Sequence, residues 1–384
     1  MTPFDDGNLT PLNDDIISED AMRAIMLEAA PSDELIGMTT AAGTTEYIEN
    51  DQAWLNELIA VDKKLKACCV ETRYLDVSML AQPVAYNSDS YALRGDPLLD
   101  TLIEAFVELE EIFNRSSIGQ LYRPSPYAES FLCSFRGCVF LHTCIDTDMP
   151  FMSWTDAEST VSDLNNRLRN WRAYIWTKNF KYQCNKGYRN SRENRNSMNG
   201  WVSDLFQVNA YLQVIRVDVG YRKEIATSVP YAFANDHRAK LCKAIHYHPI
   251  FKHIIGYAWK LEWGKSRGFH YHLLFFFDAS KVKRDVIRAQ WIGELWSKAI
   301  TNGDGTYYNC NFNAEKKYRY NALGKMSYYD AEKRVGLQYL INYLTKVDEY
   351  ASLAVSGKTF FHSRTPQLPN GPCRGRPREY QSVF

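Results

Sequence analysis

The spacing of apolar and polar residues changes character near the middle of the chain. In the first half, apolar positions recur at helical spacing over residues 98–115, and residues 155–182 predict a helix with a basic, aromatic side. In the second half, β-branched and polar residues alternate over 209–221, and apolar runs of strand length occupy 254–263 and 269–277. The pattern predicts an α+β protein with a helix-rich N-terminal region and a sheet in its second half.

Three further helices are expected in the second half. One covers residues 235–248, a second is capped by Ser280 and ends near Ile300, and the last covers 331–350. The polar stretch 187–200, with its Gly, Asn and Ser residues, is expected to be a loop or a domain boundary. The chain from Gly357 onward is expected to be irregular.

Charge is distributed unevenly along the 384 residues, although the formal net charge is zero. Residues 1–60 hold thirteen Asp and Glu and one Arg, whereas the remaining 324 residues hold 44 Lys and Arg against 32 Asp and Glu. We expect an acidic, partly disordered leader over 1–60, a helix-rich domain over 61–200, a sheet domain over 205–350 and a basic, irregular tail over 351–384. The basic body suggests a polyanionic partner, although the leader can equally be read as a solvated tail.

Membrane and secreted proteins are disfavoured. No apolar run approaches the roughly 18 residues of a membrane span, and no signal peptide is expected at the N-terminus. Nine scattered Cys without a C-x-x-C motif fit reduced thiols in a cytosol. One cluster has zinc-like ligand types but no common zinc spacing, and we expect it to pack as apolar core instead: Cys133, Cys138, His142 and Cys144.

The triplet His-Tyr-His occurs twice, on two different predicted backbones. On a helix, His246 and His248 would point about 200° apart, and Pro249 ends the helix directly after them. On a strand, His270 and His272 share one face and present two imidazoles side by side. We therefore expect a metal role for the second pair and none for the first, with a solvated His face as the alternative.

The segment GKSRG predicts a hairpin between the two apolar strands. Its register would pair residues across the strands as follows: Trp263 with Phe269, Glu262 with His270, and Lys260 with His272. Glu262 would then converge with the two imidazoles and leave open positions on a metal. Such a mixed nitrogen and oxygen set suits Mg²⁺ or Mn²⁺ and also accepts Zn²⁺. The alternatives are a slipped register or a pair between Glu262 and a lysine, and Asp218 is the alternative acid.

The last predicted helix has two stripes. The apolar one comprises Leu337, Leu340, Ile341, Leu344 and Val347, and the other, centred about 130° away, comprises Tyr339, Tyr343, Lys346 and Tyr350. A Tyr with a Lys one turn away can act as a nucleophile with a cationic neighbour. Because a phenol is normally neutral at pH 7, a metal-polarised phosphodiester would help it attack. The alternative is an amphipathic helix with exposed Tyr and Lys.

An apolar strand with His-hydrophobic-His, followed by a helix with Tyr-x-x-Lys, resembles the HUH endonucleases, which include rolling-circle initiators and relaxases. Over about 205–350 the chain is similar to the inovirus-type replication initiation proteins of filamentous phages and bacterial prophages. The resemblance implies an HUH endonuclease domain with a five-stranded antiparallel sheet flanked by helices and the HxH motif on the central strand. It also implies that the protein acts in the cytoplasm of a bacterial host.

The resemblance implies a metal-dependent DNA nickase that also rejoins strands. His270, His272 and Glu262 would hold Mg²⁺ or Mn²⁺, which polarises the scissile phosphate. Tyr343 would attack and leave a 5′-phosphotyrosine and a 3′-OH that primes rolling-circle replication, with Lys346 steadying the phosphate.

Tyr339 resembles the second of the paired tyrosines found in some phage initiators. Asn342 stands where those proteins often carry Lys, so a cycle with one tyrosine remains the alternative. The partners implied are single-stranded or hairpin origin DNA and a host helicase or polymerase. The competing functions are a non-catalytic DNA-binding regulator on the same fold and a metal-dependent hydrolase that uses water.

Further DNA contacts are predicted outside the catalytic motifs. The tail segment RGRPR, with Arg374, Arg376 and Arg378, resembles the core of an AT-hook, which fits a narrow minor groove. A generic basic tail is the alternative. Lys265 and Arg267, in the predicted hairpin loop, are candidate contacts beside the metal residues.

Overall fold

The structure is a computed structural model that describes residues 44–364, except for 86–88, 117–118, 120, 148–149 and 347–350. The first 43 residues of the expected acidic leader lie outside the described residues, as do Arg374, Arg376 and Arg378. The helix α3 begins at Thr44, so the expected boundary at residue 60 lies inside a helix.

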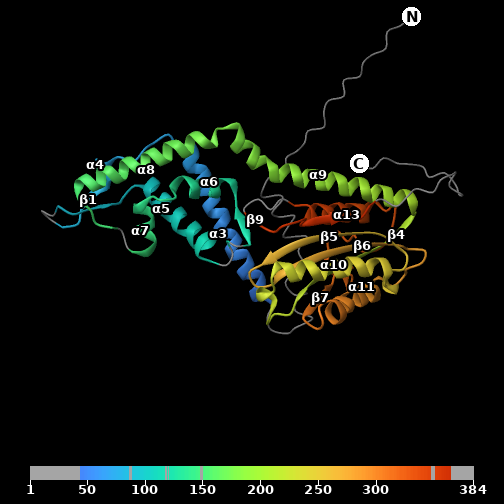
Figure 1. The fold of residues 1–384 in the computed structure, drawn as a ribbon. Helices are drawn as coiled ribbons and strands as arrows, with labels where there is room; N and C mark the ends of the chain where they lie inside the picture. Colours follow the sequence, from blue (N-terminus) through green and yellow to red (C-terminus); the bar gives the residue numbers. More distant parts are fainter. Residues whose placement is uncertain are drawn as a thin grey trace, which may run out of the picture.

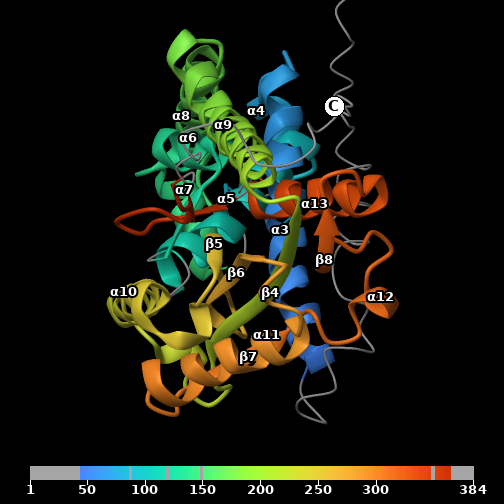
Figure 2. The same ribbon diagram turned by 90° about the vertical axis from the view of Figure 1, so that its right-hand side faces the viewer.

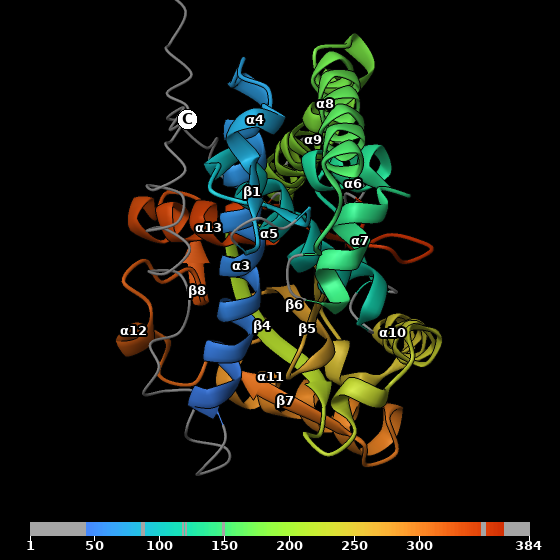
Figure 3. The ribbon, with the colours of Figure 1, turned by 90° about the vertical axis from the view of Figure 1, so that its left-hand side faces the viewer.

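The first part of the described chain is helix-rich, as predicted (Figure 1). Its helices are α3 (Thr44–Val70), α4 (Val77–Leu80), α5 (Pro97–Glu110, continued by a π-helical turn at Glu111–Arg115), α6 (Pro126–Phe135), α7 (Val139–Asp146), α8 (Trp154–Ile175) and α9 (Lys178–Val208). Helix α6 packs against both α3 and α5, α7 packs against α5, and α8 packs against α6 (Figure 3). Their core is aromatic, with Phe106, Phe131 and Trp171 fully buried. A small hairpin of β1 (Ala81–Pro83) and β2 (Tyr91–Leu93) completes this part.

The prediction of a loop over 187–200 was wrong, because these residues lie inside α9. The stretch 155–182 is also not one helix: α8 ends at Ile175, and the Thr177 side chain caps α9 by accepting from the Phe180 amide. The polar residues of α9 are tolerated because the helix buries a stripe on its other side, which includes Phe180, Ser191, Met198, Val202 and Leu205. Tertiary packing therefore overrides the weak local preference of this sequence.

The second part is a large antiparallel sheet of six strands rather than the expected five. The strands are β4 (Tyr211–Tyr221), β5 (Ile254–Gly264), β6 (Gly268–Asp278), β7 (Gly305–Asn309), β8 (Gly324–Ser327) and β10 (Phe360–His362). Their order is β10-β5-β6-β4-β7, and β8 pairs with the first residues of β4. The prediction that 209–221, 254–263 and 269–277 form strands is confirmed, with β6 in the middle of the sheet.

The hairpin register is the predicted one. Trp263 pairs with Phe269, Glu262 with His270 and Lys260 with His272. Two short strands lie in the tail that was expected to be irregular: β10 pairs with β5, and β9 (Ala351–Leu353) pairs with β3 (Tyr122–Pro124) of the helical part. The β3–β9 ladder thus ties the helical part to the chain just beyond the sheet domain.

Helices cover both faces of the sheet (Figure 2). One face packs against α10 (Tyr231–Tyr247) and α11 (Asp285–Glu294, continued by a π-helical segment at Leu295–Ile300), and the other against the second half of α9 and α13 (Ala331–Leu344). A short helix, α12 (Ala314–Lys317), and 3-10 turns at Ala226–Ser228 and Pro249–Phe251 complete the elements. None of the described helices has the length and apolar character needed to cross a bilayer.

Three helix limits differ from the predicted ones. Helix α10 starts at Tyr231, ahead of the expected Asn235, and α11 starts at Asp285 without the expected Ser280 cap. Helix α13 ends at Leu344 rather than at residue 350, with Thr345 as its C-cap. The last difference matters most, because it places Lys346 beyond the helix.

Side chains of β6 point alternately to the two helical layers that cover the sheet. Its odd-numbered side chains, from Phe269 to Phe277, join the core on the α10 and α11 side, whereas Leu274 and Phe276 join the core under α9 and α13. His270 and His272 are even-numbered like Leu274, and alternate residues of a strand share a face, so both histidines lie on the α9 and α13 side.

Candidate metal and nucleophile centre

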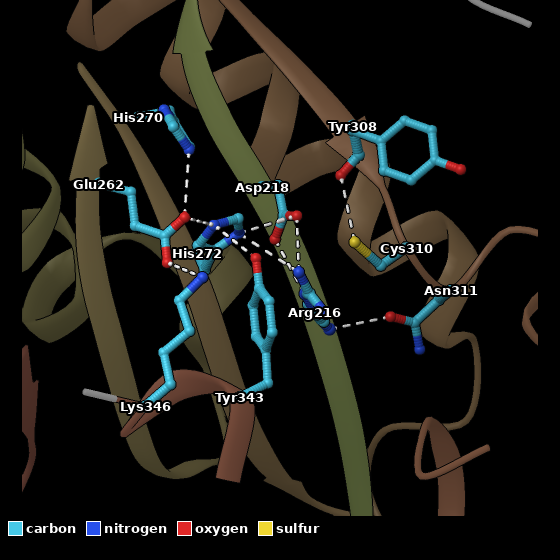
Figure 4. A network of polar contacts seen from close by, with 10 residues as sticks. All are labelled: Arg216, Asp218, Glu262, His270, His272, Tyr308, Cys310, Asn311, Tyr343 and Lys346. Atoms are coloured by element: carbon cyan, nitrogen blue, oxygen red, sulfur yellow. Dashed lines mark hydrogen bonds and ion pairs between the residues drawn. The ribbon is translucent and has the colours of Figure 1, made fainter. Parts of the chain in front are cut away.

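Glu262 of β5 faces both histidines of β6 (Figure 4). Its Oε2 atom lies 3.2 Å from His272 Nε2 and 3.6 Å from His270 Nε2. One possible ligand atom from each of the three residues lies within 4.8 Å of the other two. Within the described residues, this is the one group of three or more His, Cys, Asp and Glu side chains that is arranged to hold a metal ion.

The environment of His270 fits a metal ligand. Its Nδ1–H donates to the Gly268 carbonyl at 3.0 Å, which leaves Nε2 with a lone pair aimed toward Glu262. That nitrogen is buried and has no hydrogen-bond partner, an arrangement that normally costs about 1–3 kcal/mol. Burial, together with the nearby Arg267 charge, lowers the pKa of His270. A neutral imidazole with an unsatisfied lone pair is what a cation requires.

His272 is oriented from behind by Asp218 of β4. Its Nδ1 lies 2.9 Å from Asp218 Oδ2, so the ring directs Nε2 toward Glu262. Burial opposes charge on His272, but the two carboxylates outweigh it and raise its pKa. Of the two acids left open by the sequence, Glu262 is the one grouped with both histidines as a possible metal ligand. Asp218 contacts the other ring nitrogen of His272, the place of the carboxylate in carboxylate–histidine–metal triads.

Arg216 is a component that the sequence analysis missed. It lies two residues before Asp218 on the same face of β4, and its Nε and Nη2 bind the Asp218 carboxylate at 2.9 and 2.8 Å. Its guanidinium also lies 5.1 Å from the centre of the Tyr343 ring. The available signal was a charged pair in the middle of a strand otherwise rich in β-branched residues, because such a strand is expected to be buried.

Tyr343, in the last turn of α13, places its hydroxyl 3.2 Å from His272 Nε2. Lys346 reaches the same centre from beyond the helix, with its Nζ 3.2 Å from Glu262 Oε1 and 4.8 Å from the Tyr343 ring centre. Burial and the Glu262 charge raise the pKa of Tyr343, while Lys346 and Arg216 act against that rise. Lys346 is therefore not positioned by the helical stripe that the sequence predicted. It is positioned by the chain that follows the C-cap residue Thr345.

Tyr339 occupies a different place from Tyr343. Its ring stacks on Tyr320, with 4.5 Å between ring centres and 10° between ring planes. Both tyrosines of α13 nevertheless line one cavity, together with Arg216 and Arg319. The structure thus brings Tyr343 to the metal residues and leaves Tyr339 on the neighbouring cavity wall.

The other predicted site residues have simpler positions. Lys265 and Arg267 are exposed in the turn between β5 and β6. His246 lies near the end of α10 and His248 caps the following turn by accepting from the Ile250 amide, which confirms the helix-end prediction. The Cys133 cluster forms no ligand group among the described residues. Its Cys138 is buried, as expected for core packing, but the expectation was wrong for Cys133, which is exposed, and Cys144 is only partly buried.

A comparison with known families covers this part of the chain. Residues 202–360 match the YagK/YfjJ C-terminal domain family model. That family consists of phage- and prophage-type proteins, and its match spans every residue of the centre from Arg216 to Lys346. No curated protein and no solved structure gives a significant match. The YagK/YfjJ match therefore agrees with the expected phage or prophage character.

Proposed function

We propose that the protein initiates rolling-circle replication by nicking and rejoining single-stranded DNA at the Tyr343 centre, in the manner of HUH endonucleases. One observation carries the proposal: the Tyr343 hydroxyl lies 3.2 Å from His272 Nε2, within a buried group of two imidazoles and a carboxylate. A nucleophile beside a set of metal ligands is the arrangement that phosphodiester transfer requires.

The proposed reaction exchanges one phosphodiester for another. The Tyr343 oxygen forms a bond to phosphorus while the bond to the 3′-oxygen breaks, and the hydrogen lost by the phenol is balanced by the one gained at the 3′-OH. The products are a 5′-phosphotyrosine and a free 3′-OH, and attack by a 3′-OH on the phosphotyrosine rejoins the strand. Because no water is consumed, the reaction is reversible.

The residues of the centre divide this work. Glu262, His270 and His272 would hold Mg²⁺ or Mn²⁺, which when bound supplies positive charge to the scissile phosphate. Lys346 and Arg216 lie on the Tyr343 ring and favour its ionised form against burial. Asp218 keeps His272 in place through its Nδ1.

The proposed substrate is single-stranded or hairpin origin DNA in the cytoplasm of a bacterial host. A host helicase and polymerase would then extend the 3′-OH. Tyr339, on the wall of the cavity that it shares with Tyr343, is the candidate for a second cleavage in a cycle with two tyrosines.

The test is a covalent-adduct assay with 3′-labelled single-stranded oligonucleotides that tile the DNA flanking the gene. With Mn²⁺ present, an SDS-stable protein–DNA adduct is expected, and Tyr343→Phe should abolish it. Tyr339→Phe is the matched control on the same helix and should still form the first adduct. Cleavage without any adduct would identify a hydrolase, and binding without cleavage would identify a regulator. An adduct that survives Tyr343→Phe but not Tyr339→Phe would show that the nucleophile is Tyr339.

A further inference from the structure

The first half of α9 exposes a continuous stripe of cations and tyrosines. Residues spaced three and four apart on a helix share a side, and this spacing brings together Lys178, Lys181, Tyr182, Lys186, Tyr188, Arg189 and Arg192. The buried residues in this half of α9, Phe180 and Ser191, lie on the opposite side. Because the sequence predicted a loop from residue 187 onward, the second half of the stripe is revealed only by the helix.

Large aromatic side chains are unusually exposed along this stripe. Trp176, directly before the helix, is 64% exposed, Tyr182 is 56% exposed and Tyr188 is 48% exposed. Cations lie over two of these rings: Lys181 Nζ is 5.2 Å from the Trp176 ring, and the Arg189 guanidinium is 4.2 Å from the Tyr182 ring. Exposed aromatic rings of this kind can stack on another planar group.

This surface is strongly basic. Residues 176–195 contain six Lys and Arg but a single acidic residue, Glu193. The neighbouring helix α8 does not share this character. Its Trp171 and Arg172 are buried in the core, and Arg167 pairs with Asp163 at 2.7 Å.

Helix α9 also connects this stripe to the catalytic centre. Its beginning packs in the helical part through Phe180, and its end packs on the sheet through Met198 and Trp201 (Figure 1). Between them, the Ser191 hydroxyl donates to the Thr345 carbonyl, one residue before Lys346. A linear polymer that bound along α9 would therefore reach the part of the molecule where α13 carries Tyr343.

We propose that the exposed α9 stripe, from Trp176 to Arg192, binds single-stranded DNA. Its cations would contact phosphates, and Trp176, Tyr182 and Tyr188 would stack on bases, which is how proteins hold single strands without reading their sequence. Stacking requires bases whose faces are open, so the aromatic rings favour a single strand over a duplex. The choice of DNA as the nucleic acid rests on the proposed function.

Binding can be measured apart from chemistry. The full chain carrying Tyr343→Phe, in EDTA, is titrated into a labelled oligothymidylate of about 20 nucleotides, longer than typical single-strand site sizes, and fluorescence anisotropy gives the Kd. Tyr182→Ala is expected to weaken binding about fivefold or more. The triple variant Lys181→Ala/Lys186→Ala/Arg192→Ala should reduce the slope of log Kd against log salt by about 2.

The matched control removes exposed cations from the α10 side of the molecule: Lys240→Ala/Lys243→Ala/Lys252→Ala. Circular dichroism checks that all variants fold. The proposal is overturned if the control weakens binding as much as the α9 variants do, or if neither does. Tighter binding of a matched duplex, or of oligouridylate, would also overturn it.

The two proposals fail in different ways. If the α9 variants bind like the parent while the wild-type chain forms its covalent adduct, the α9 surface is wrong and the nickase stands. If the α9 variants lose affinity but no adduct ever forms, the surface stands and the nickase falls.

Discussion

The Arg216–Asp218 pair offers a direct test of how the centre is supported. Substituting Asp218→Asn keeps the shape of the side chain but removes its charge. The substitution takes a bidentate partner from Arg216 and the Nδ1 partner from His272. The Arg216 guanidinium then remains buried without a counter-charge, and the orientation of His272 is no longer held.

The expected loss of stability follows from burial. The Arg216 side chain is 8% exposed and that of Asp218 is 22% exposed, so the pair belongs with buried ion pairs, where removing one partner costs about 3–5 kcal/mol. We expect about 3 kcal/mol, because Asn can still accept one hydrogen bond and Asp218 is partly solvated. For a domain of this size the melting temperature should fall by about 6–12 °C.

Urea denaturation, followed by circular dichroism in EDTA, measures the change. Asp236→Asn is the matched control, since Asp236 forms a surface pair with Lys240, 2.8 Å apart, with both side chains more than half exposed. It should cost much less stability than Asp218→Asn, because exposed ion pairs contribute little. The double variant Arg216→Met/Asp218→Asn should be more stable than Asp218→Asn alone, because no buried charge is left unpaired. Equal losses in Asp218→Asn and Asp236→Asn would refute the reasoning.

The pH dependence provides a second check on the same variant. Burial works against the Asp218 carboxylate, but Arg216 and His272 hold its pKa well below the usual value. The contribution of the Asp218 carboxylate to folding stability is therefore complete above its unfolded-state pKa of about 3.9. That contribution is lost as the pH falls toward the pKa in the folded state. The stability gap between the wild-type protein and Asp218→Asn should narrow as the pH drops below about 4.

Two further outcomes follow from the structure. Gly336→Ala would normally stabilise a helix by up to about 1 kcal/mol, but a Cβ here would lie 2.8 Å from the Tyr320 carbonyl oxygen and 2.9 Å from the Asn321 carbonyl carbon. We therefore expect a loss of about 1–3 kcal/mol in urea denaturation, and unchanged or increased stability would contradict this. Mn²⁺ at about 100 times its Kd should stabilise the wild-type protein by about 2.7 kcal/mol, measured as a thermal shift. The shift should vanish in His270→Ala but persist in His246→Ala, and its persistence in both would exclude this metal site.

The local sequence determined much of the arrangement of the centre. The residues next to one another in the chain decide whether the backbone forms a strand, and in a strand alternate side chains share a face. Alternation in β6 places His270 and His272 on one face, and the short GKSRG turn sets the pairing of Glu262 with His270. The strong apolar character of 269–277 marked the central strand of the sheet. These features need only the residues within one hairpin.

Tertiary structure decided what depends on distant partners. Glu262 and Asp218 lie on strands that flank the same histidines, and only the packed sheet shows that one joins the ligand atoms and the other supports His272 from behind. Helix α9 is stabilised by its buried side, which packs on other elements, and its polar residues 187–200 were therefore wrongly predicted to form a loop. Lys346 reaches Glu262 from beyond a helix end, and the tail contributes β10 to the sheet. In each case the deciding contact joins residues far apart in sequence, where local propensity carries no information.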